Sequence, residues 1–374
     1  MSRVLSLRAL NRATLERQLL LRRSRLAARE AVAHLIALQA QEADPPYLGL
    51  WSRVEGFTHG VLTTLLYERA VVRGPALRAT QHLLCAEDFL WLRPLVQPVL
   101  ERGRQAAMGR LTRDVDLDAL ATAARELLQG RTLTRTQLRE LLRDRWPESD
   151  PDALAWSVQY LVPVIHPPPN GTWRRRGPTP ITLAEAWLGR PLERGAATER
   201  LIRRYLAAFG PATAADVQTW SGLRGCDEVL EEMRPSLRAL RSDTGDQLFD
   251  IPDAPLPDPD VPAPPRFLPR FDNLLVAHAD RRRLVADDDR RRVITGSLVR
   301  ATLMLDGFVQ GTWTLTDGTL TVNPFRPLSP EETAAVTEEG HRLLAFAAAG
   351  APGHAVSSAG ADASCIVVAV RRSG

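Results

Sequence analysis

The sequence of 374 residues predicts a mainly α protein with β structure, of the α+β class. Two observations support this prediction. An order of three helices followed by a short hairpin occurs three times before residue 252. After a proline-rich segment, alternating apolar residues and Asp-Gly turns replace the helical periodicity. We therefore expect three similar units in tandem, followed by a C-terminal β-barrel with one helix packed on it.

The first unit is predicted at residues 1–112. Apolar residues at helical spacing predict helices at 12–22, 27–39, 60–70 and 86–108. Two short extended runs at 71–73 and 82–84 would form its hairpin. This hairpin is short and interrupted by Pro75, so the first unit follows the pattern least closely.

The second unit is predicted at residues 113–194. Its helices are expected at 116–129, directly after Thr134, and at 151–160; Thr134 is a good helix cap. An apolar run at 161–166, a turn at Asn170-Gly171 and a basic run at 172–176 predict a hairpin with an aromatic, basic outgoing strand.

The third unit is predicted at residues 195–251, with a helix at 198–209, then the run 210–220, then a helix at 225–240. Runs at 237–240 and 247–250 enclose the turn 243–246 and predict a third hairpin. Three helices followed by a two-stranded wing is the winged-helix variant of the helix-turn-helix. Because the order recurs in tandem, we predict three winged-helix domains.

Seven prolines between Pro252 and Pro265 predict a stiff connector at 252–266. The domain after it, 267–374, is predicted to be the β-barrel. Its strands are expected at 271–276, 293–296, 298–305, 308–315, 319–323 and 365–370, with a helix at 330–349. Asp306-Gly307 and Asp317-Gly318 are expected to be hairpin turns.

Composition is that of a globular protein, with 44% hydrophobic and 25% charged residues. No run of about eighteen apolar residues occurs, so we expect a cytoplasmic protein without a membrane partner. Cys85, Cys226 and Cys365 are far apart, and the histidines are scattered. This spacing predicts no disulfide framework, no metal site and no cofactor.

All 48 basic residues are arginines, because the sequence contains no lysine. No side chain can therefore form a Schiff base. A protein of this composition acting on DNA bases would not be a lysine-dependent lyase, since only the Met1 amine could substitute. The net charge of +4 permits a nucleic-acid partner without requiring one.

Gln39 and Gln41 flank one small residue where the predicted helix 27–39 ends. Gln39 lies on the apolar stripe of that helix, since Ile36, Leu35 and Val32 precede it at helical spacing. Asp44-Pro45-Pro46 follows and predicts extended or turn backbone, in which residues 39 and 41 project to the same side. Two neutral amides could hold one water or one polar atom of a substrate. The alternative is a capping Gln39 and a solvated Gln41.

Several motifs together resemble the bacterial winged-helix DNA glycosylases, the superfamily with the AlkZ-type interstrand-crosslink glycosylases. The resemblance runs nearly end to end. The matching motifs are Leu10-Asn11-Arg12-Ala13, Gln18-Leu19-Leu20-Leu21, Leu38-Gln39-Ala40-Gln41-Glu42, Gly49-Leu50-Trp51-Ser52-Arg53, Arg78-Ala79-Thr80-Gln81-His82-Leu83, Phe271-Asp272-Asn273-Leu274-Leu275 and His278-Ala279-Asp280-Arg281.

The resemblance implies a C-shaped DNA channel with Gln39 and Gln41 as the catalytic pair. It implies a monofunctional glycosylase for N7-alkylated purines, including bulky natural-product adducts and interstrand crosslinks, in DNA repair or toxin self-resistance. The partner would be double-stranded DNA carrying alkylated or crosslinked guanine, bound by a monomer in the nucleoid. Glu42 could assist as a base, or be solvated.

Two arginine triplets are candidates for DNA binding. The first is Arg174, Arg175 and Arg176 beside Trp173, and the second is Arg281, Arg282 and Arg283 after His278. The alternative for each triplet is a solvated run, with salt bridges to residues 287–289 for the second. Arg78 and His82 on the first hairpin could line the channel, although His82 could equally be structural.

A protein of a different class remains possible from the sequence alone. A non-catalytic winged-helix regulator or a drug-sequestering protein would share much of the predicted fold. A regulator would normally present base-reading side chains on a recognition helix. The run 212–215, Ala-Thr-Ala-Ala, offers few such groups.

Overall fold

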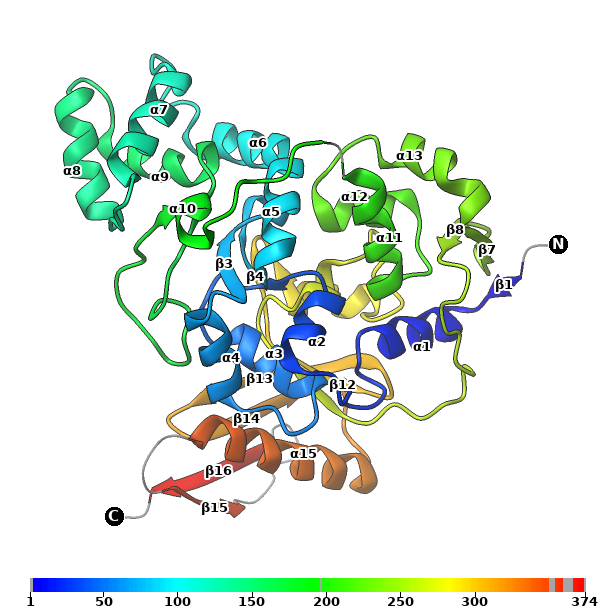
Figure 1. Ribbon diagram of the computed structural model, residues 1–374. Coiled ribbons are helices and arrows are strands. Elements are labelled where there is room, and N and C mark those ends of the chain that lie inside the picture. The colour runs from blue at the N-terminus through cyan, green and yellow to red at the C-terminus, as the bar shows by residue number, and fades with distance from the viewer. Residues whose placement is uncertain (1–2, 196, 350–353, 359–365, 373–374) are drawn as a thin grey trace.

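This computed structural model describes residues 3–195, 197–349, 354–358 and 366–372. Along the chain, three mainly helical regions are followed by a C-terminal region with a β-sheet. Helices α7 to α9 lie at one end of the molecule and the C-terminal sheet at the other (Figure 1). The N-terminal region lies between them. The protein is thus of mixed α and β structure, as predicted.

The first region carries most of the helices near the centre. Its elements are β1 (Val4–Leu5), α1 (Leu7–Arg17), α2 (Ala28–His34), β2 (Leu38–Gln39), α3 (Pro45–Arg53), α4 (His59–Tyr67), β3 (Val71–Pro75), β4 (Gln81–Cys85), α5 (Ala86–Leu95) and α6 (Gln97–Met108). β3 and β4 form the predicted hairpin, joined by a 3₁₀ turn, η1, at Leu77–Ala79. β2 adds to its other edge, in the order β2-β4-β3.

Four predictions for this region are wrong in detail. α1 begins at Leu7 rather than near 12, because Ser6 caps it by accepting a hydrogen bond from the Ala9 N–H. The predicted helix 27–39 ends at His34. Pro45 and Pro46 start α3 instead of extending the chain, since proline lacks only an N–H that the first turn does not use. The predicted helix 86–108 breaks at Val96, just before Pro98.

The second region follows the predicted order closely. Its elements are α7 (Leu117–Leu128), α8 (Arg135–Arg145), α9 (Pro151–Leu161), β5 (Val164–Ile165), β6 (Thr182–Leu183) and α10 (Ala184–Leu188). Thr134 caps α8, as predicted. The outgoing strand is misplaced in the prediction, because β5 pairs with β6 and not with 172–176. Residues 166–181 form a long loop, which we call the arginine loop; its prolines supply no N–H for a sheet.

The third region contains α11 (Thr198–Phe209), α12 (Ala214–Ser221), α13 (Cys226–Met233), β7 (Arg238–Ser242) and β8 (Gln247–Asp250). The predicted hairpin is present as β7-β8. The predicted helix 225–240 ends at Met233, before a 3₁₀ turn that contains Pro235. β1 pairs in parallel with β7, so the N-terminal strand joins this region.

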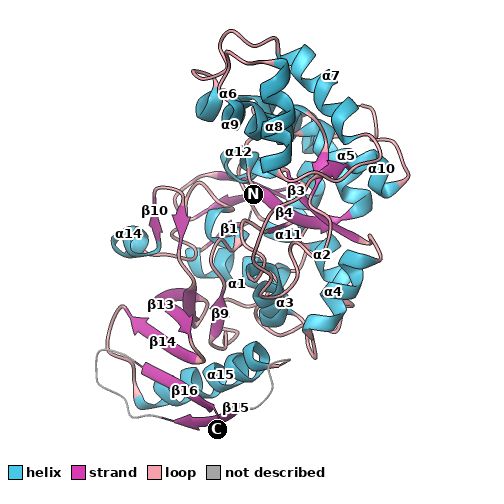
Figure 2. Cartoon of the chain, turned by 90° about the vertical axis from the view of Figure 1, so that its left-hand side faces the viewer, coloured by secondary structure: helices cyan, strands magenta, loops and turns pink. Residues whose placement is uncertain are grey.

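The C-terminal region is mainly β. Its elements are β9 (Arg266–Leu268), η3 (Asn273–Val276), η4 (Asp287–Asp289), α14 (Arg290–Val293), β10 (Ile294–Thr295), β11 (Leu298–Val299), β12 (Thr302–Leu305), β13 (Phe308–Thr316), β14 (Thr319–Pro324), α15 (Pro330–Ala348), β15 (His354–Ser358) and β16 (Ile366–Arg372). The described strands form an antiparallel sheet in the order β15-β16-β14-β13-β12-β9, against which α15 packs (Figure 2). Asp306-Gly307 and Asp317-Gly318 are turns with positive φ, as predicted.

Two expectations for this region fail or stay open. The run 271–276 contains a 3₁₀ turn, η3, and not a strand. Within the described ranges β15 and β9 do not pair, so the sheet is open and the predicted closed barrel is not confirmed. The number of winged-helix domains and their boundaries likewise remain predictions.

Separate hydrophobic clusters explain how the regions pack. One joins α2, α3 and α4 to the C-terminal sheet and α15. A second joins the β3-β4 hairpin, α5 and α6 to the third region. A third lies wholly within residues 115–181. The first region therefore contacts both the third and the C-terminal regions, and it holds the segment that carries Gln39 and Gln41 between them.

Arg53 fixes α3 to the C-terminal region. Both of its Nη atoms lie 2.9 Å from a carboxylate oxygen of Asp272, and both side chains are buried. Ser52 donates a hydrogen bond of 2.6 Å to the Phe267 carbonyl.

Among the described residues, no helix is both long and apolar enough to cross a membrane.

Candidate functional site

Gln39 ends the edge strand β2, and Gln41 lies in the bend that follows it, so the pair does not sit at the end of a helix. Ile36, with φ of +68°, turns the chain away from α2 and into β2. Gln39 then pairs with His82 of β4, and the Ala40 N–H donates to the Gln81 carbonyl at 2.8 Å. Extended backbone carries residues i and i+2 to the same side of a strand. Gln39 is half-buried and Gln41 is exposed.

Arg78 holds the side chain of Gln39. Its Nη2 lies 3.0 Å from Gln39 Oε1 and 2.9 Å from Asn273 Oδ1, and its Nη1 donates to the Trp220 carbonyl. Asn273 Nδ2 in turn donates to the Ala37 carbonyl at 2.8 Å. The Gln39 rotamer is thus fixed by groups from η1, η3 and α12. Its Oε1 retains a second lone pair for another donor.

The conformation of the η1 turn aims Arg78 at this site. Arg78 and Ala79 have φ of +52° and +58°, a left-handed conformation that non-glycine residues rarely adopt. Such a residue stores on the order of 1 kcal/mol of strain. Burial, and secondarily Arg281, lower the pKa of Arg78 to about 10. The guanidinium therefore stays protonated at neutral pH.

Arg73 of β3 fixes the backbone between the glutamines. Its Nε donates to the Ala40 carbonyl at 2.7 Å and its Nη2 to the Gln41 carbonyl at 3.3 Å. The remaining Nη1 lies 2.5 Å from Asn170 Oδ1 in the arginine loop. Burial lowers the pKa of Arg73 to about 10. One buried cation thus ties the Gln-x-Gln segment to the second region.

Gln41 faces a small polar cavity. Its Oε1 accepts a long hydrogen bond of 3.4 Å from the Gln81 N–H, and Gln81 Nε2 donates to Gln159 Oε1 at 2.9 Å. The cavity, about 170 Å³, lies between the β2-β4 edge and helices α8 and α9. Its walls include Arg135, which stacks on Trp156 at 3.5 Å.

Glu42, the candidate assisting base, lines a different hollow. Its carboxylate lies 2.9 Å from Arg270 Nη1 in a partly exposed ion pair. The neighbouring Gln41 lines the small cavity instead. Glu42 is thus already paired with a cation on another wall of the site.

The two candidate histidines are buried. His82 Nδ1 lies 3.0 Å from the Thr80 carbonyl, and His278 Nε2 lies 3.0 Å from the Phe209 carbonyl. Burial lowers the pKa of each to about 3, with Arg78 adding to the effect at His82 and Arg283 at His278. Neither imidazole offers a surface to DNA in this structure, and the structural alternative fits His82.

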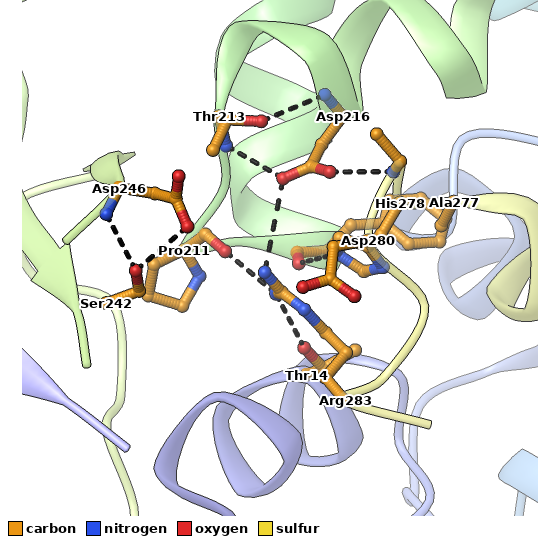
Figure 3. A network of polar contacts seen from close by, with 12 residues as sticks. Thr14, Pro211, Thr213, Asp216, Ser242, Asp246, Ala277, His278, Asp280 and Arg283 are labelled. Carbon is orange, nitrogen blue, oxygen red and sulfur yellow. Dashed lines mark hydrogen bonds and ion pairs between the residues drawn. The ribbon is translucent and has the colours of Figure 1, made fainter. Parts of the chain in front are cut away.

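The second arginine triplet does not form a basic surface. Arg283 is buried, and it donates to the Pro211 carbonyl and contacts Thr14 and Asp216 (Figure 3). Arg282 forms an ion pair of 2.6 Å with Asp280. The sequence had suggested residues 287–289 as salt-bridge partners of this triplet, but Arg282 pairs with Asp280 instead. Arg281 is half-buried, and its charge lies close enough to lower the pKa of Arg78.

The first triplet lies on the exposed arginine loop. Arg174, Arg175 and Arg176 are all exposed, whereas Trp173 is anchored in an aromatic cluster. Its ring lies 4.3 Å from the His59 ring and 5.7 Å from that of Phe346. Asp44 accepts the Arg174 N–H at 2.6 Å and pairs with Arg176 at 3.5 Å. The loop therefore presents cations next to the Gln-x-Gln segment.

Sequence reasoning missed the residues that support the pair. Arg73 and Asn273 are polar residues within the mainly apolar runs 71–76 and 271–276. A polar side chain in a buried run must find a partner, which is the signal that could have identified them. Within the described residues, no group of three or more His, Cys, Asp or Glu side chains could hold a metal ion.

Among the described residues, the groups that hydrogen-bond the side-chain amides of Gln39 and Gln41 are the Arg78 guanidinium and the Gln81 N–H. The nearby Glu42 carboxylate is paired with Arg270. The arrangement can therefore orient a small polar molecule. Such a site suits a reaction whose leaving group is already activated.

Comparisons with known proteins agree with one another. A family model described as "DNA glycosylase AlkZ-like" matches residues 32–346. The chain is 25% identical over 359 residues to an "Interstrand DNA cross-link repair glycosylase" of Streptomyces sahachiroi, covering 87% of this chain and 92% of that protein. The solved structure "Streptomyces sahachiroi DNA glycosylase AlkZ" superposes with a TM-score of 0.74 at 22% identity, covering 92% of this chain and 97% of that one.

Proposed function

This chain belongs to the AlkZ-like DNA glycosylase family, and from that premise we propose that it hydrolyses the N-glycosidic bond of N7-alkylated purines with Gln39 and Gln41. Its substrates would be bulky natural-product adducts and interstrand crosslinks, which it would process as a monomer on duplex DNA. The observation that carries the proposal is the fixed amide of Gln39 at the end of β2, with the exposed Gln41 two residues further along the chain.

The leaving group determines why amides suffice. Alkylation at N7 places a positive charge on guanine, so the base departs as a neutral molecule without prior protonation. In the proposed reaction a water oxygen forms a bond to C1′ as the C1′–N9 bond breaks. The electron pair of that bond goes to the imidazolium ring, and the water proton goes to solvent.

The two glutamine carbonyls would accept hydrogen bonds from the attacking water and place it against C1′. Their oxygen dipoles would also stabilise the developing oxocarbenium ion. Arg78 occupies only one lone pair of Gln39 Oε1 and leaves the other available. Glu42 is not required in this scheme, since its carboxylate is paired with Arg270.

DNA would be held through the arginine loop. Arg174, Arg175 and Arg176 are exposed and adjoin the Gln-x-Gln segment through Asp44. Contacts of this kind to phosphates position a duplex without reading its sequence. A bulky adduct cannot easily be flipped into a narrow pocket. The edge of the protein that carries Gln39 and Gln41 would instead approach the adduct through a groove of the DNA duplex.

The direct test uses duplex DNA with a single N7-methylguanine or an N7-alkylguanine crosslink. The purified protein is incubated with it, and hot alkali then cleaves abasic sites. Strand cleavage should appear only after alkali and vanish in the Gln39→Ala/Gln41→Ala variant. Gln129→Ala, an exposed glutamine at the end of α7, is the matched control and should retain activity. If the wild type binds DNA yet yields no abasic site from any adduct, a non-catalytic binding protein becomes the better interpretation.

We also propose that the reaction stops at the abasic site. Without a lysine, no side chain can form the Schiff base of a lyase. Borohydride added during the reaction should therefore trap no protein–DNA adduct. Trapping that disappears when the amine of Met1 is blocked would show lyase activity from the N-terminus.

A further inference from the structure

A second hollow, larger than the small polar cavity, adjoins the candidate site. It has a volume of about 680 Å³ and lies between α3, the arginine loop, β13 and α15. We call it the α3–β13–α15 hollow. Glu42 and Asp44 belong to its wall, so it begins directly after Gln41 in the chain. The helix and sheet that bound it lie next to one another in the lower half of Figure 1.

The floor of this hollow is apolar. Four of its residues belong to the hydrophobic cluster that joins α3 to the C-terminal sheet, and each is largely buried: Leu48, Ala301, Trp313 and Leu344. Trp173 adds an aromatic wall from the arginine loop. Trp313 Nε1 donates to the Leu268 carbonyl at 2.9 Å, which fixes the orientation of its ring. A preformed apolar floor of this kind suits an apolar organic group.

The charges around the hollow argue against a phosphate bound inside it. Its charged lining residues are three arginines and three carboxylates: Arg174, Arg176, Arg270, Glu42, Asp44 and Asp317. Arg270 is paired with Glu42 and Arg176 with Asp44. Because the formal charges cancel, the hollow would not concentrate an anion as strongly as a uniformly basic cleft. The occupant it favours is neutral and apolar.

We propose that the α3–β13–α15 hollow binds the organic body of the alkyl adduct, the part of the lesion that is not the nucleobase. This inference rests on the proposed function. An N7 substituent starts on the same base whose C1′ bond the glutamines would address. A bulky substituent therefore has to extend beside the Gln-x-Gln segment, and this hollow adjoins that segment.

The proposal gives the hollow a role in specificity and not in chemistry. A methyl group at N7 is too small to reach its floor and should be excised independently of it. A large aromatic substituent should gain binding free energy from the buried apolar surface. The protein should therefore prefer bulky adducts, and the preference should depend on the hollow alone.

The test compares two duplexes, one with N7-methylguanine and one with N7-(naphthylmethyl)guanine. Ala348→Trp fills the hollow from α15, at a half-buried position on its wall. Ala345→Trp places the same side chain on an exposed position of the same helix that does not line the hollow. Thr314→Trp, from an exposed position of β13, fills the hollow from the opposite wall should Ala348→Trp fail to fold.

Filling the hollow should lower kcat/KM for the naphthylmethyl adduct about tenfold or more and leave that for methylguanine within about twofold. Ala345→Trp should change neither value. An equal loss on both adducts by folded variants, or no loss on either, would overturn the proposal.

Binding by the Gln39→Ala/Gln41→Ala protein separates this idea from the proposed reaction. That protein should bind the naphthylmethyl duplex more tightly than the methyl duplex, and added Ala348→Trp should abolish the difference. If the wild type excises neither adduct, the proposed function fails. The difference in binding affinity still tests whether the hollow binds the substituent of the adduct. Equal affinities for the two duplexes would refute it.

Discussion

Arg78 Nη2 lies 3.0 Å from Gln39 Oε1, and the same nitrogen lies 2.9 Å from Asn273 Oδ1. One half-buried cation thus joins a strand edge of the first region to a turn of the C-terminal region. The sequence suggested Arg78 as a DNA contact. Its hydrogen bonds give it a second role, since they orient a side chain of the candidate catalytic pair.

Arg78→Lys should therefore slow the reaction more than it weakens binding. An ammonium keeps the charge but cannot reach all three acceptors with the fixed fork of a guanidinium. Misplacing a catalytic group by about 1 Å can reduce the rate about a hundredfold. We expect the single-turnover rate to fall about ten- to a hundredfold at saturating enzyme, with the Kd for lesion DNA within about twofold. A weaker Kd at an unchanged saturated rate would restore the role of a DNA contact.

The arginine loop should carry much of the non-specific DNA affinity. Removing one arginine–phosphate interaction should reduce the slope of log K against log salt by about 0.9. Arg174→Ala/Arg175→Ala/Arg176→Ala should therefore bind undamaged duplex more weakly, with a salt slope lower by up to about 2.7. The control is Arg282→Ala, whose side chain is paired with Asp280. An unchanged salt slope in the triple variant would place the DNA elsewhere.

Substitutions at Ile36 should measure the backbone strain at the residue where the chain leaves α2. A buried β-branched residue at φ of +68° is uncommon, and glycine adopts this conformation without a steric penalty. Ile36→Ala and Ile36→Gly should both destabilise the protein by roughly 2–5 kcal/mol, because each leaves a cavity. The glycine variant should be the more stable of the two by about 1 kcal/mol. Urea unfolding measures this order, and an alanine variant at least as stable as the glycine variant would contradict it.

Acid should destabilise the protein through its buried histidines. Burial lowers the pKa values of His82, His166 and His278 to about 3 from an ordinary value of 6.5. Below pH 6.5 the unfolded chain binds protons that the folded protein does not. The free energy of unfolding should therefore fall as the pH drops from 6.5 towards 3, by up to about 1.4 kcal/mol per pH unit for each histidine.

His166→Asn tests this dependence at one site. The asparagine amide can still donate to the Pro180 carbonyl, which His166 Nδ1 contacts at 3.1 Å. The variant no longer titrates near neutrality, so its unfolding free energy should change less between pH 7 and pH 5 than that of the wild type. Urea titrations at the two pH values give the slopes. Identical slopes would mean that His166 binds a proton as readily in the folded protein as in the unfolded chain.

Local sequence signals determined much of the secondary structure. Thr134 and Asp150 accept hydrogen bonds from the N–H groups of the first turns of α8 and α9, and the two Asp-Gly pairs form hairpin turns with positive φ. These features depend on residues a few positions apart, so a pattern reveals them. The Gln-x-Gln motif was also visible in the sequence, and it lies within residues 32–346, which the family model matches.

Tertiary structure decided what surrounds that motif. Where α2 ends is set by the packing of the buried Ile36, which outweighs the unfavourable φ. Arg78 meets Gln39 across 39 residues and Asn273 across 195, and no local pattern encodes such a contact. Burial also separates arginines that look alike in the sequence, since Arg283 is inside the protein while Arg175 is exposed. The residue types set the available chemistry, and long-range packing determined which side chains face the site.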